Sequence, residues 1–256
     1  MEDTLLNLLI PTSNVTLLAL MLTTFFISGI VKGFLGIGLP AAAMGLLTLV
    51  VSPSYAISLL VLPIFFTNLF QFFRSRGRLQ TVKFYWPFGV TIVISIFVTS
   101  LFLDQYPTGL LTIAIGVAMV IFALNGLSNF KLKLGPEMHW QLSFGIISGI
   151  LGGLSSIWSP PVAMYMIARN LDKDSFIAAT GFLFLIGSVP LALGLFIGGT
   201  LNIGIVLQSL TGLIAVLTGF RLGEILRSRV DQNLFQKAVL IAFLIMGGRL
   251  IAVGIF

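Results

Sequence analysis

The sequence has no cysteine and a single histidine, and charged residues of either sign are scarce. Without cysteine, the chain cannot form a disulfide, a thiolate nucleophile or a cysteine-bound metal centre. Only 9% of its 256 residues are charged and 57% are hydrophobic, whereas about a quarter of an ordinary soluble domain is charged. Most segments are therefore too apolar to face water, and the composition predicts a protein that crosses a membrane several times.

Acidic residues are missing from the middle of every long apolar run. All eight lie at the termini, in loops or at helix ends: Glu2, Asp3, Asp104, Glu137, Asp172, Asp174, Glu224 and Asp231. An intramembrane enzyme would need a nucleophile with a base, paired carboxylates or a metal cluster. It is the alternative function that the sequence supports least. We expect no enzymatic activity, no cofactor, no metal and no proton relay through a carboxylate inside the membrane.

Basic residues account for the net charge of +6, and they occur in four clusters. Two of the 14 lysines and arginines, Lys32 and Arg249, lie outside the clusters. The clusters are Arg74, Arg76, Arg78 and Lys83; Lys131 and Lys133; Arg169 and Lys173; and Arg221, Arg227, Arg229 and Lys237. The positive-inside rule places all four clusters on the cytoplasmic side of a cell inner membrane and both termini outside. Charge arranged in this way does not indicate nucleic-acid binding.

Apolar runs long enough to span a bilayer, which takes about 20 residues, predict an all-α fold. Eight runs are candidates for full spans: about 15–31, 55–73, 84–103, 107–124, 140–154, 175–198, 203–220 and 234–255. Two further runs, 40–51 and 160–168, are too short to cross and predict half-helices or re-entrant segments. The expected architecture is therefore eight spans plus two half-helices.

The two short runs belong to a segment that occurs twice, at residues 27–44 and 147–164. At an offset of 120 residues, nine positions are identical, among them Ser28/Ser148, Gly29/Gly149, Gly33/Gly153 and Pro40/Pro160. Interruptions at matching places in two halves are typical of the binding sites of secondary transporters. We therefore divide the chain into a first repeat (1–125), a cytoplasmic linker (126–139) and a second repeat (140–256). Because the repeats enter the membrane from opposite sides, we predict that they are inverted copies.

Each copy is interrupted by a stretch rich in glycine or serine and restarts at a proline. Proline fits the first turn of a helix, where its missing N–H costs nothing, so Pro40 and Pro160 mark the starts of the two half-helices. A helix start offers free N–H groups and partial positive charge, which attract anions. We predict that the two starts meet near the membrane midplane and bind a small anion; helix packing through small residues is the alternative interpretation of the glycines.

Most candidate binding residues lie in or near the two interruptions; two amides lie in the run at 55–73 and one arginine in the last run. Lys32 is a membrane lysine, which is costly and points to pairing with an anion or else to snorkelling; snorkelling is also the alternative for Arg249. Serine hydroxyls and two amides donate to an oxyanion or else to neighbouring backbone. The full set is Lys32, Gly33, Gly36, Gly38, Pro40, Asn68, Gln71, Gly153, Ser155, Ser156, Trp158, Ser159, Pro160 and Arg249.

The duplicated segment, with Pro-Ala-Ala-Ala-Met at 40–44 and Pro-Val-Ala-Met at 161–164, resembles the sulfite exporter TauE/SafE family of membrane permeases. Asn68, Gly77-Arg78-Leu79 and the second-half Gly199-Thr200-Leu201 match further family elements. The resemblance covers nearly the whole chain, and it implies a transporter that exports sulfite, a sulfonate or another organosulfur anion.

The chain departs from the family pattern in the second interruption, where Ser155, Ser156, Trp158 and Ser159 replace glycines, so the identity of the substrate stays open. An anion channel would use the same half-helix dipoles and is the alternative function. The expected partners are a small anion, the lipid bilayer and, in a homodimer, a second copy of the chain.

Overall fold

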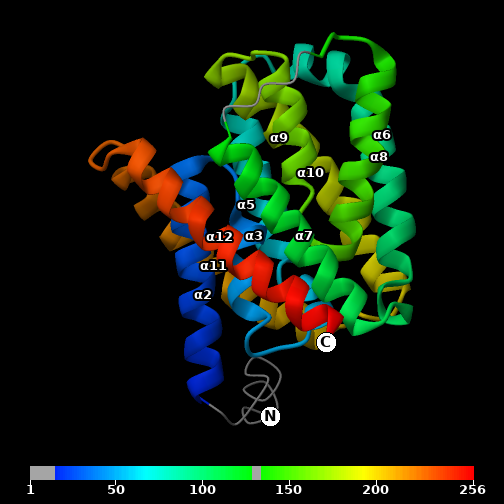
Figure 1. Ribbon diagram of the computed structural model, residues 1–256, viewed down its shortest axis with the longest axis vertical. Helices are drawn as coiled ribbons and strands as arrows, with labels where there is room; N and C mark the ends of the chain where they lie inside the picture. Colours follow the sequence, from blue (N-terminus) through cyan, green and yellow to red (C-terminus); the bar gives the residue numbers. More distant parts are fainter. Residues whose placement is uncertain (1–14, 129–133) are drawn as a thin grey trace.

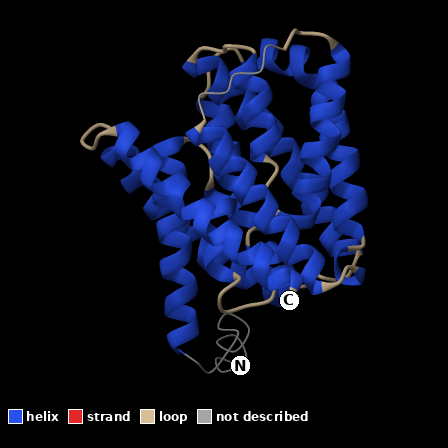
Figure 2. Ribbon diagram, viewed as in Figure 1, coloured by secondary structure: helices blue, strands red, loops and turns tan. Residues whose placement is uncertain are grey.

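The computed structural model describes residues 15–128 and 134–256, and within them the chain forms eleven α-helices, one 3-10 turn and no strand (Figures 1 and 2). The helices are α2 (Val15–Leu35), α3 (Leu39–Leu47), α4 (Pro53–Leu59), α5 (Val61–Arg74), α6 (Arg78–Leu101), α7 (Thr108–Leu127), α8 (Met138–Ser155), α9 (Ser159–Ala168), α10 (Lys173–Ile197), α11 (Ile203–Leu226) and α12 (Gln232–Ile255). The all-α prediction is confirmed. Lys131 and Lys133 lie outside the described residues.

Six of the described helices are long and apolar enough to cross a membrane: α2, α6, α7, α10, α11 and α12. The bent pair α4–α5 makes a seventh if it is counted as one span. Helix α8 has 18 residues and includes His139 and Gln141, and it is not one of the six. The protein is thus a multi-pass membrane protein, whereas the count of eight full spans stays a prediction.

The two short helices are α3, with nine residues, and α9, with ten. Each carries proline in its first turn, Pro40 in α3 and Pro160 in α9, as predicted from the missing proline N–H. Helix α3 ends at Leu47 rather than at residue 51. Neither helix is long enough to cross a hydrocarbon core of about 30 Å at 1.5 Å per residue.

The expected single span at 55–73 is instead two helices, α4 and α5, bent by 40° at Leu60. Pro63 has no N–H to donate to the carbonyl of Leu59 four residues earlier, which interrupts the helix. The Ser209 hydroxyl of α11 replaces that bond, because it donates to the Leu59 oxygen at 2.7 Å and accepts the Leu62 N–H at 3.2 Å. A residue from the other half of the chain thus pairs with the Leu59 carbonyl and the Leu62 N–H at the bend.

The direction of the chain reverses at each short helix (Figure 1). Helices α2 and α4–α5 both run from the lower end of the view to the upper end, so α3 brings the chain back between them. Helices α8 and α10 both start at the upper end, and α9 returns the chain there. The described basic loops 75–77, 169–172 and 227–231 lie toward the upper end, and α12 ends at the lower end.

The two halves interlock rather than form separate bodies. Helix α2 packs along α11 and α8 packs along α6, so the first helix of each half lies on the other half. A Cβ added at Gly33 would overlap the backbone carbonyl of Phe220, and one at Gly153 would overlap the side chain of Thr99. Small residues thus allow both pairs of helices to approach closely.

Candidate anion site

The first break, residues 36–38, separates α2 from α3. Gly36 has φ 82° and Gly38 has φ 94°, in the left-handed region that glycine adopts without strain. The Gly36 N–H donates to the Lys32 carbonyl at 2.7 Å, and this backbone hydrogen bond completes the last turn of α2. Gly38 is buried and directly precedes α3.

The second break, residues 156–158, separates α8 from α9 and follows the same plan with different residues. Ser156 stands where the first half has Gly36, and its φ of 59° is also left-handed, an uncommon conformation for a residue with a Cβ. Its N–H donates to the Gly152 carbonyl at 2.8 Å. Two prolines, Pro160 and Pro161, occupy the first turn of α9 and leave it fewer free backbone N–H groups than α3.

The two breaks meet in one small pocket, which we call the central cavity. Its lining combines the start of α3, the start of α9, and residues of α2, α5 and α10: Lys32, Gly38, Leu39, Pro40, Ile64, Thr67, Asn68, Ser156, Trp158, Ser159 and Phe184. It leaves about 10 Å³ for the centre of a water-sized sphere, room for roughly one water molecule. The starts of the two short helices therefore line one pocket, whereas its place at the membrane midplane and the binding of an anion stay predictions.

Lys32 is the cationic side chain of the central cavity and is only 2% exposed. Its amino group donates to the Oδ1 atom of Asn68 in α5 and lies 6.0 Å from the centroid of the Phe184 ring. Among the described residues, no carboxylate lies within ion-pair distance of it. A buried ammonium without a counter-charge is costly in a low dielectric, which makes Lys32 the candidate partner of an anion.

Three residues at the second break that line the cavity carry buried donor atoms without a protein partner among the described residues. The Oγ atoms of Ser156 and Ser159 and the Nε1 atom of Trp158 make no hydrogen bond within the described residues. These side chains are between 0% and 4% exposed. A buried polar group left unpaired costs about 1–3 kcal/mol, and three of them around one pocket indicate a ligand that accepts hydrogen bonds.

A wider pocket, which we call the vestibule, adjoins the central cavity and shares Lys32 with it. The vestibule leaves about 260 Å³ by the same measure. Its lining is Lys32, Gly33, Gly36, Phe70, Gln71, Arg74, Ser75, Arg76, Asp174, Ile177, Phe220, Glu224 and Arg227. Since these include residues of the 75–77 loop and of adjoining helix ends, the vestibule opens at the end of the molecule that carries the described basic loops (Figure 1).

The predicted residues fall into three groups. Seven of them line the central cavity: Lys32, Gly38, Pro40, Asn68, Ser156, Trp158 and Ser159. Three more, Gly33, Gly36 and Gln71, line the vestibule instead. The Gln71 side-chain amide is already used, since it donates to the Ile177 carbonyl at 3.2 Å and to the Thr180 hydroxyl at 3.1 Å.

The remaining four predicted residues line neither pocket. Gly153 packs against Thr99, and Arg249 is exposed on α12. The Ser155 hydroxyl donates to the Leu151 carbonyl at 2.6 Å and accepts the Ile157 N–H at 3.1 Å, so it closes the end of α8. Pro160 is buried in the first turn of α9 and serves the helix start.

Sequence reasoning missed two kinds of site residue. Phe184 of α10 forms a wall of the central cavity, and nothing sets it apart from the other 22 phenylalanines. Arg74 and Arg227 line the vestibule, although they were interpreted only as signals of orientation. Nothing in the sequence pointed to these two, because the fold alone brings the ends of α5 and α11 to the pocket that Lys32 lines.

The comparisons with known proteins agree with this architecture. The family model described as Sulfite exporter TauE/SafE matches residues 20–250, a stretch that contains both breaks, the central cavity and the lining of the vestibule. No curated protein and no solved structure matches the chain. Since the family match covers most of the sequence, the chain belongs to the sulfite exporter TauE/SafE family.

Proposed function

We propose that this protein exports a small sulfur-containing anion, such as sulfite, a sulfonate or another organosulfur anion, across a cell inner membrane. The observation that carries the proposal is the buried Lys32 amino group, which has Asn68 as its hydrogen-bond partner and unpartnered donors across the same cavity. Family membership favours a sulfur oxyanion over other anions. Both termini would lie outside, with the described basic loops in the cytoplasm.

The chemistry of the central cavity suits an oxyanion with several acceptor oxygens. Lys32 would supply charge from the first half, and Ser156, Trp158 and Ser159 would each donate one hydrogen bond from the second half. Hydrogen bonds to charged groups contribute about 1.5–3 kcal/mol each. The N-terminus of α3 adds a partial positive charge at the same place.

Transport through this site would follow alternating access, with the two halves rearranging around the anion. The central cavity is narrower than any sulfur oxyanion, so its walls have to separate before one binds. On the cytoplasmic side, the vestibule leads to Lys32. An inside-negative potential favours the exit of an anion by about 2.3 kcal/mol per charge per 100 mV, so export needs no carboxylate relay.

The test is transport by the purified protein in liposomes. Vesicles loaded with sulfite, methanesulfonate, sulfate or acetate are given an inside-negative potential, and efflux is followed with and without protein. We expect efflux of at least one sulfur anion that saturates with concentration and shows counterflow. Protein-dependent efflux of acetate alone, or of no anion, would contradict the proposal. Efflux that neither saturates nor shows counterflow would favour the anion channel.

A further inference from the structure

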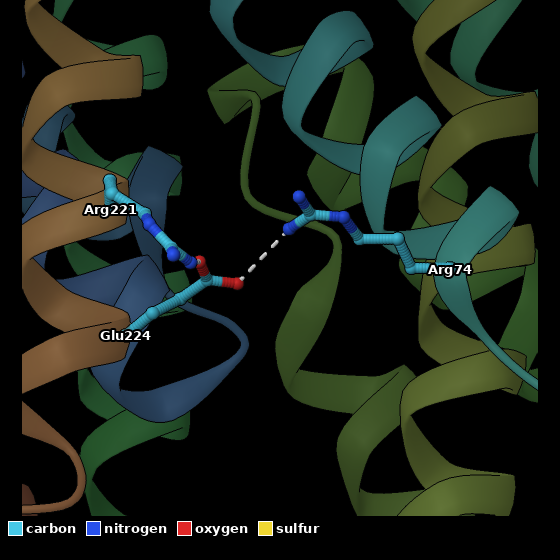
Figure 3. A network of polar contacts seen from close by, with 3 residues as sticks. All are labelled: Arg74, Arg221 and Glu224. Carbon is cyan, nitrogen blue, oxygen red and sulfur yellow. Dashed lines mark hydrogen bonds and ion pairs between the residues drawn. The ribbon is translucent and has the colours of Figure 1, made fainter.

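The rim of the vestibule carries an ion-pair network that joins the two halves of the molecule. Glu224 of α11 lies 2.9 Å from Arg221, one turn earlier on the same helix, and 3.4 Å from Arg74 at the end of α5 (Figure 3). Figure 3 shows the Glu224 carboxylate reaching across from α11 toward the Arg74 guanidinium. The Arg74–Glu224 pair is thus the contact that crosses the rim.

This network contributes little to holding the fold together. The side chain of Arg74 is 67% exposed and that of Glu224 is 29% exposed, and exposed ion pairs are screened by water and salt. The Arg74–Glu224 distance is also long for a charge-assisted hydrogen bond, which is typically 2.7–2.9 Å. The carboxylate is therefore an exchangeable partner of Arg74.

The lining of the vestibule has an excess of positive charge. It contains four cations, Lys32, Arg74, Arg76 and Arg227, and two anions, Asp174 and Glu224. Arg227 is partly committed, because its Nε atom donates to the Phe34 carbonyl at 2.7 Å and so closes the end of α2. Clefts lined by one sign of charge raise the local concentration of the opposite ion.

We infer that the vestibule is a second anion site, in which a sulfur oxyanion takes the place of the Glu224 carboxylate on Arg74 on its way to Lys32. The two sites are linked through Lys32, which lines both pockets. A guanidinium presents two parallel N–H donors that match a sulfonate or sulfite group. Glu224 would hold Arg74 in place when no anion is there and would limit binding at low anion concentration. The inference rests on the proposed function for the identity of the anion.

The absence of cysteine allows a test that does not depend on transport. Ser75 lines the vestibule. Thr108, the exposed first residue of α7, does not line it, so Ser75→Cys and Thr108→Cys give a probe and a matched control. Each is labelled with neutral N-ethylmaleimide in the presence of increasing methanesulfonate or of acetate. We expect methanesulfonate to slow labelling of Ser75→Cys at least threefold while leaving Thr108→Cys unchanged, and acetate to act more weakly.

Two further substitutions test whether the protection from labelling depends on Arg74 and Glu224. In the Ser75→Cys background, Arg74→Gln should abolish protection, and Glu224→Gln should lower the half-protecting concentration by at least threefold, since the competing carboxylate is gone. Equal protection in all three proteins, or none in the parent, would overturn the inference. If the unaltered protein carries no anion in liposomes, the proposed function fails, whereas protection at Ser75→Cys still decides whether the vestibule binds one.

Discussion

The first and second breaks have the same backbone plan and different chemistry. Both end a helix in a left-handed residue and restart it at a proline, but Gly36 and Gly38 shape the first break, whereas Ser156 holds the second. The first half brings the charge, Lys32, and the second brings three neutral donors. The position equivalent to Lys32 is Gly152. We propose that the repeat supplies two breaks of matching backbone and that a binding site arises where their side chains differ.

The largest expected effect comes from removing the charge of the first break. Lys32→Met should weaken sulfite binding at least about 100-fold, or ~2.7 kcal/mol, because a charge-assisted hydrogen bond is lost. Thermal stability should hold or rise, since a buried ammonium is replaced by an apolar side chain of similar length. Titration calorimetry and thermal melting of the same preparations give both quantities. Unchanged affinity would remove Lys32 from the site.

A second difference concerns the glycines that pack the two halves together. Gly33→Ala would press on the Phe220 backbone, whereas Gly153→Ala would press on the Thr99 side chain. Overpacking costs about 1–3 kcal/mol, and backbone yields less readily than a side chain. We expect Gly33→Ala to lower the melting temperature more than Gly153→Ala does.

A second substitution at the Gly153–Thr99 contact tests whether the clash causes the loss of stability. Adding Thr99→Gly to Gly153→Ala removes the clashing atoms and should recover part of the lost stability. No rescue, or a larger loss at Gly153 than at Gly33, would mean that these glycines serve some purpose other than close packing.

The smallest effect separates two adjacent serines. Ser156→Gly should relieve the left-handed strain and raise the melting temperature slightly, yet weaken sulfite binding about tenfold, or ~1.4 kcal/mol. Ser155→Ala should do the reverse: it frees the Ile157 N–H that the hydroxyl accepts and lowers stability, while affinity stays within twofold. If both substitutions changed the affinity for sulfite by the same factor, Ser156 could not be assigned as a ligand donor and Ser155 as a helix cap.

Much of this arrangement could be predicted because membrane helices leave strong local signals. Length and apolarity located the long helices, and proline after a small-residue stretch located α3 and α9. The bend at Leu60 was missed although Pro63 signals it, because hydropathy alone does not register a lost backbone hydrogen bond.

Contacts between distant parts of the chain could not be predicted in the same way. Arg74 and Glu224 are 150 residues apart in sequence, and the contact of Gly153 with Thr99 depends on how α8 and α6 pack. The sequence left two interpretations of the repeated glycines open, anion binding and helix packing. The fold favours packing for Gly153, which lies against Thr99. Lys32 and Asn68 were each singled out, but only the fold shows that they meet.

The most direct test of a single anion site shared by both breaks is the position of the anion itself. Selenite has the shape and charge of sulfite and scatters X-rays anomalously, so crystals of the protein grown with selenite would locate it. We predict an anomalous peak about 3–4 Å from the Lys32 Nζ atom and from the Oγ atom of Ser156 or Ser159, as hydrogen bonding through the selenite oxygens requires. A peak in the vestibule alone, or none near either break, would contradict the shared site.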